Sequence, residues 1–188
     1  AVFYNSVGRY DESEAAYLRA LKVMKANPSG GSGLVRCSAN LGALYYDLGR
    51  FEEAEKNLLE AISLHATVYG KDHPEIRPEL DKLATIYWRM GRMADAVECY
   101  ARALGGDVDA EIDSGNANTF ANFGVLLHTM EHYEKADWIF QRVAAFTESA
   151  YGPESLPMAS ILRRLAGLEE DSGNSELALD YFARSFEI

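Results

Sequence analysis

Apolar residues recur along this chain with the spacing of one helical face, and they do so in paired segments. Residues 34–48 carry a first stripe with intervals of three and four, made of Leu41, Leu44, Tyr45 and Leu48. Residues 51–68 carry a second stripe, made of Ala54, Leu58, Ala61, Ile62 and Leu64. Gly49 separates the two segments and tolerates the positive φ of a tight turn. The pattern therefore predicts a helical hairpin.

The same pattern returns throughout the chain. A turn signal, usually glycine followed by a polar and then an aromatic residue, recurs at intervals of 40 to 42 residues, at positions 8–10, 49–51, 91–93, 131–133 and 173–175. A fixed period of this length indicates a solenoid, in which each unit packs only on its neighbours. We expect an all-α, right-handed solenoid of about five antiparallel helix pairs, elongated and without strands.

Small side chains keep a constant distance from each turn. Seven positions before it stand Ala1, Gly42, Ala84, Gly124 and Ala166, and five positions after it stand Ser13, Ala54, Ala96, Ala136 and Ala178. Two helices approach closely only where side chains are small, so these positions predict the helix crossing inside each hairpin.

These signals divide the chain into one array of repeats. Their approximate bounds are 1–33, 34–75, 76–115, 116–157 and 158–188. The connecting segments are short and rich in Gly, Pro and Asp. We expect the run Gly30-Gly31-Ser32-Gly33 to be a flexible connector.

The repeats resemble the tetratricopeptide repeat, through Leu41-Gly42, Tyr45, Gly49, Phe51, Ala54, Leu58 and Ala61 and their equivalents in later repeats. The usual repeat has about 34 residues. The extra length here lies near Tyr69-Gly70-Lys71-Asp72-His73-Pro74, which is similar to the long repeats of kinesin light chains and nephrocystin-like proteins. Two residues depart from the pattern: Glu131 replaces a turn glycine, and Glu169 stands where Tyr45 and Tyr87 stand in earlier repeats.

The resemblance implies a peptide-binding groove lined by the first helices of the repeats. Carried onto this chain, the family's register gives ten candidate peptide-binding residues: Arg36, Asn40, Tyr46, Lys82, Trp88, Arg89, Asn122, His128, Arg163 and Arg164. Asn40, Lys82, Asn122 and Arg164 occupy one equivalent slot. An amide in that slot can both donate to and accept from a peptide backbone.

Charge narrows the class of partner. The chain has 18 basic and 29 acidic residues and a net charge of −11, which argues against nucleic acid or an anionic membrane as the ligand. The candidate groove is close to neutral, so it favours a protein or peptide, with an acidic segment as the best match. No apolar run reaches the roughly 18 residues of a membrane span. The two cysteines, Cys37 and Cys99, lie far apart, and we expect an intracellular, cytoplasmic protein.

We expect no catalytic residue, cofactor or metal. His128 and His132 are four positions apart on the sequence, but they have no evident third ligand, and His73 precedes Pro74 as a loop residue. The sequence thus predicts a protein–protein interaction scaffold or adaptor. The alternative is a structural or regulatory arm of a larger protein, whose groove is filled by the same polypeptide. The sequence leaves the partner open.

Overall fold

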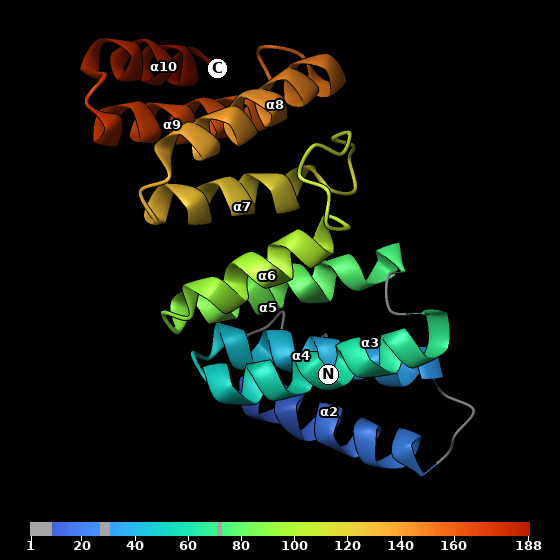
Figure 1. The fold of residues 1–188 in the computed structure, drawn as a ribbon. Helices are drawn as coiled ribbons and strands as arrows, with labels where there is room; N and C mark the ends of the chain where they lie inside the picture. The colour runs from blue at the N-terminus through green and yellow to red at the C-terminus, as the bar shows by residue number, and fades with distance from the viewer. Residues whose placement is uncertain (1–8, 27–30, 71–72) are drawn as a thin grey trace. The chain divides into compact units, whose positions relative to one another are not determined.

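The computed structural model describes residues 9–26, 31–70 and 73–188. These residues form two compact units, which divide between Gly106 and Asp107. Every regular element in the described residues is helical (Figure 1). The first unit contains α2 (Tyr10–Lys25), α3 (Gly31–Asp47), α4 (Phe51–Tyr69), the short 3₁₀ helix η2 (Pro74–Ile76), α5 (Arg77–Arg89) and α6 (Met93–Ala103). The second contains α7 (Ala117–Thr129), α8 (Tyr133–Tyr151), α9 (Leu156–Ser172) and α10 (Ser175–Glu187).

Consecutive helices pair as hairpins. α3 packs on α4 and α5 on α6 in the first unit, while α7 packs on α8 and α9 on α10 in the second. Within each unit, successive hairpins also touch, through α4 and α5 and through α8 and α9. The all-α repeat fold predicted from the sequence is confirmed, and the predicted helices at 34–48 and 51–68 correspond to α3 and α4.

The turn inside each hairpin has the same backbone geometry in all four described copies. Gly49, Gly91 and Gly173 have φ of 72°, 75° and 92°, and Glu131 has 61°. The next amide closes the turn by donating to a carbonyl five residues earlier, as Arg50 does to Tyr45 at 2.8 Å. Glu131 therefore occupies a true glycine position, and it is the one described residue other than glycine with a positive φ.

The predicted small residues lie at the helix crossings. Ala54, Ala96 and Ala136 have no exposed surface. At Gly124, a β-carbon would stand 2.6 Å from Cε1 of Phe140, far inside van der Waals contact. The register read from the sequence is therefore correct in the described repeats, whereas Ala1 and Gly8 lie outside the described residues.

An arginine that follows the turn glycine connects successive repeats. Nη1 of Arg50 lies 2.9 Å from Oε2 of Glu14 on the preceding α2, and its guanidinium stacks 4.3 Å from the ring centre of Tyr45. Arg92 repeats this arrangement with Glu55 at 2.8 Å and with the ring of Tyr87 at 4.1 Å. The Gly-Arg turn signal thus encodes a contact between repeats as well as a turn.

The last repeat replaces this arrangement with a local one. Glu169 is buried at the position of Tyr45 and Tyr87, and Asn174 takes the place of the arginine. The amide of Asn174 donates to Oε2 of Glu169 at 2.6 Å. Glu169 and Asn174, which replace the tyrosine and the arginine of earlier repeats, therefore bind one another inside one hairpin.

The prediction of a flexible connector at Gly30–Gly33 is wrong for Gly31, Ser32 and Gly33, which form the first turn of α3. A β-carbon at Gly31 would lie 3.2 Å from Cγ2 of Val68 on α4. Glycine is used here because two helices approach closely, and composition alone does not distinguish that role from flexibility.

Candidate functional site

The ten residues predicted to bind a peptide all lie on the first helices of their hairpins. α3 and α5 touch each other in the first unit, and α7 and α9 touch in the second. None of the ten side chains is fully buried, so all can be reached by a ligand. Within each unit, the equivalent slot residues are therefore on neighbouring helices: Asn40 and Lys82, and Asn122 and Arg164.

In the first unit, the predicted residues of α3 and α5 include both aromatic and basic side chains. The ring of Tyr46 packs against Phe51, with 6.0 Å between ring centres. The guanidinium of Arg89 lies 6.0 Å from the ring centre of the half-buried Trp88, and Lys82 is exposed. This combination offers apolar surface beside positive charge.

The second unit contains a cavity of about 270 Å³ between α7, α8 and α9. One of its lining residues, Arg164, is among the ten predicted from the sequence, and Asn118, Ala121 and Ser160 lie on the same two first helices, α7 and α9. Phe146 and Tyr151 of α8 add aromatic surface to the wall. The first helices thus provide polar groups and a cation, and the second helix provides an apolar wall.

Two interactions connect α7 with α9 across the same face. Nη1 of Arg164 donates to the carbonyl of Ala121 at 3.2 Å, which holds the guanidinium at the cavity. Nε2 of His128 lies 2.8 Å from Oδ2 of Asp171. His128 is therefore engaged by a residue of the neighbouring repeat, which its sequence position did not indicate.

A second group of side chains was missed by the sequence analysis. His65 on α4 comes together with His73 and Glu75, and one potential ligand atom of each lies within 4.8 Å of the others. A cavity of about 460 Å³ in the same unit is also lined by His73, Pro74 and Arg77. The only sequence signal for this group is that two histidines bracket the glycine that ends α4.

Comparison with known proteins agrees with the repeat pattern. Residues 34–107 match the tetratricopeptide repeat family model. A clustered mitochondria protein homolog from Danio rerio is 26% identical over 154 residues, covering 81% of this chain but 11% of that protein's length. The chain thus spans about a tenth of the length of this curated relative.

Two solved structures share the fold. BtubC (BKLC) from P. vanneervenii superposes with a TM-score of 0.79 and 22% identity, over 95% of this chain and 73% of that one. A Podosopora anserina protein, described as a kinesin light chain with nearly identical TPR-like repeats, gives 0.81 and 14%, over 98% and 89%.

Among the described residues, no helix combines the length and the apolar character needed to cross a membrane. The chain has the helical repeat fold of these solved structures, and residues 34–107 are similar to the tetratricopeptide repeat.

Proposed function

We propose that this chain is a protein–protein interaction module that binds an extended peptide along the first helices of its repeats. Repeats of this family generally mediate interactions between proteins. The observation that carries the proposal is the cavity of the second unit, which Asn118, Ser160 and the predicted residue Arg164 line from the first helices α7 and α9.

The chemistry of this face favours an acidic segment. Arg163 is exposed on α9, and Arg164 points its guanidinium at the cavity wall, although the chain as a whole has a net charge of −11. A guanidinium binds a carboxylate with two parallel hydrogen bonds. Exposed ion pairs each contribute only about 0–1 kcal/mol, so affinity also needs the aromatic wall that Phe146 and Tyr151 add to this cavity.

The experiment is a selection from a peptide display library with the immobilised chain. We expect the selected peptides to be extended and acidic, and to bind less well as salt increases. The double variant Asn122→Ala/Arg164→Ala should lose the selected peptides, whereas Lys56→Ala/Lys135→Ala, which removes two exposed cations of second helices, should keep them. Selection of basic peptides, or equal binding by both double variants, would refute the proposal.

A structural or regulatory arm remains the second candidate, and one comparison favours it. The clustered mitochondria relative carries its similar segment within a much longer chain. If the groove is filled by the same polypeptide, a flanking segment supplied as a separate peptide should compete with every selected peptide. We also propose that the repeats belong to the long subtype that is similar to kinesin light chains. We propose a cytoplasmic location, which is consistent with the buried free thiols of Cys37 and Cys99.

A further inference from the structure

His65 is a buried imidazole whose hydrogen bonds are missing. Its residue is 4% exposed, and neither ring nitrogen has a hydrogen-bond partner among the residues that the structure describes. A buried polar group without a partner destabilises the folded state, so such a group needs a specific explanation.

Two carboxylates approach His65 but stop short of hydrogen bonds. Oε2 of Glu75 lies 3.7 Å from Nε2, and Oε2 of Glu79 lies 3.9 Å from Nδ1. Both distances exceed the roughly 3.2 Å limit of a good hydrogen bond. The 3.7 Å separation is instead close to the roughly 3.3 Å between two ligands of one tetrahedral ion with bonds near 2.0–2.1 Å.

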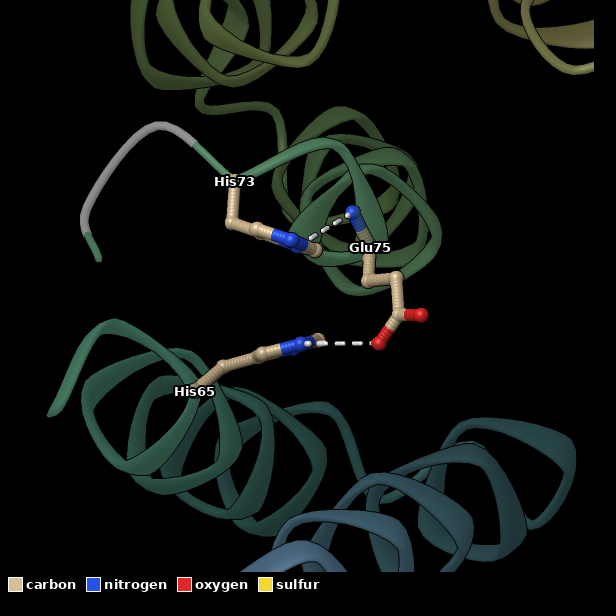
Figure 2. A group of neighbouring side chains, drawn as sticks. All are labelled: His65, His73 and Glu75. Atoms are coloured by element: carbon tan, nitrogen blue, oxygen red, sulfur yellow. Dashed lines mark hydrogen bonds and ion pairs between the residues drawn. The ribbon is translucent and has the colours of Figure 1, made fainter. Parts of the chain in front are cut away.

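His73 supplies a second imidazole close to His65 and Glu75. Figure 2 shows His65 rising from α4 toward His73 and Glu75, which belong to the segment that leads into α5. Nδ1 of His73 accepts a long, 3.3 Å hydrogen bond from the amide of Glu75. A metal bound by His73 would replace this weak bond with a stronger one.

The structure assigns His65, His73 and Glu75 as a binding site for one divalent transition-metal ion of the zinc class, with Glu79 as its outer carboxylate. Two imidazoles and a carboxylate are a known ligand set for zinc. The Glu75 side chain is 67% exposed, so its carboxylate has room to rotate toward a bound ion.

Glu79 has the position expected of the outer carboxylate. Metal-bound histidines usually donate their second ring N–H to a carboxylate or a carbonyl, which fixes the ring orientation. With Nε2 of His65 on the metal, Nδ1 carries the proton and faces Oε2 of Glu79.

The ion would join successive repeats. His65 lies on the second helix of one hairpin, and Glu75 and Glu79 lie on η2 and on the first helix of the next. Binding would therefore fix α4 against α5 at the point where the chain passes between them. The site does not depend on the proposed peptide groove.

The test is a titration of the chelator-treated chain with zinc chloride, followed by isothermal calorimetry. We expect one zinc per chain, and substitution of a ligand should weaken binding at least as much as loss of an outer partner does, about tenfold or more. His73→Gln and Glu75→Gln are the test variants, because both side chains are at least partly exposed and their replacement spares the core. The exposed His132→Gln in the other unit is the matched control.

Thermal melting provides a second readout. A ligand that binds only the folded state raises the melting temperature, so zinc at one fixed concentration should stabilise the wild type and His132→Gln more than His73→Gln or Glu75→Gln. Absence of saturable zinc binding would overturn the assignment. So would binding that survives both test variants, or that disappears in His132→Gln.

Discussion

The hydroxyl of Tyr45 donates a 2.8 Å hydrogen bond to Oε1 of Glu14, which lies on the preceding repeat. Arg50 binds the other oxygen of the same carboxylate and stacks on the Tyr45 ring. Tyr87 hydrogen-bonds Glu55 in the equivalent place one repeat later. The phenols therefore contribute to the joints between repeats, and their ionisation should loosen those joints.

Alkaline pH should destabilise the first unit through these two residues. Burial, followed by the hydrogen bond to Glu14, raises the pKa of Tyr45 to about 12, and burial with the bond to Glu55 raises that of Tyr87 to about 12. The unfolded value is about 10. Between these values the unfolded state loses protons that the folded state keeps, so the free energy of unfolding falls as pH rises from about 10 to 12.

Denaturant melts from pH 8 to 12 measure this dependence. Tyr45→Phe/Tyr87→Phe should flatten the decline, after an initial loss at neutral pH of about 0.5–1.5 kcal/mol for each lost hydrogen bond. Tyr151→Phe, on an exposed ring of the second unit, is the matched control and should leave the curve unchanged. An equally steep decline in the double variant would contradict the assignment.

Glu131→Gly should stabilise the protein or leave it unchanged. Its φ of 61° is unfavourable for a side chain but not for glycine, whose greater freedom in the unfolded state offsets part of the gain. We expect the free energy of unfolding to rise by up to about 1 kcal/mol. Gly91→Glu, at a φ of 75°, is the reverse change and should lower the free energy of unfolding. If Glu131→Gly instead lowered it by more than about 1 kcal/mol, the Glu131 side chain would be shown to stabilise the turn.

Two glycines inside helices of the second unit should respond in opposite ways to alanine. At Gly124 the new β-carbon would overlap the ring of Phe140, so Gly124→Ala should cost about 1–3 kcal/mol. At Gly167 the new β-carbon would meet no atom within 4 Å among the described residues, apart from chain neighbours and the nearby backbone of its own helix. Gly167→Ala should therefore gain about 0.5–1 kcal/mol from helix propensity. Chemical denaturation measures both, and equal signs would disprove the packing argument.

Arg142 should hold the loop before α7 in one conformation. Its guanidinium donates to the carbonyls of Val108 and Ala110, at 2.5 Å each, and stacks 4.6 Å from the ring centre of Trp138. Charged hydrogen bonds contribute about 1.5–3 kcal/mol each, so Arg142→Ala should raise the rate of proteolysis in residues 107–113 at least about tenfold. Digestion at the wild-type rate would show that other contacts hold the loop.

The hairpins could be predicted from sequence because their determinants are local. The turn at Glu131 and the crossings at Ala54 and Gly124 depend on residues at fixed positions within one repeat, and a periodic chain shows such positions several times. The same register predicted which residues of the first helices are accessible. The cavity of the second unit did not, because its wall combines three helices whose side chains meet only after packing.

The histidine group was not predictable for a similar reason. His65 is spaced like a core residue of α4, and His73 looks like part of a loop signal; only the return of the chain at Gly70 places them together. Gly31 was misread because a close helix contact and a flexible linker use the same residue. Distances between segments, and not local pattern, decide both cases.

The most direct test of the proposed function is the backbone amide chemical-shift map of the chain with a selected acidic peptide. We expect the largest changes on the first helices, α3 and α5 in the first unit and α7 and α9 in the second, with Asn122 and Arg164 among the residues affected. Changes confined to the second helices α4, α6, α8 and α10, or to the loops, would contradict it.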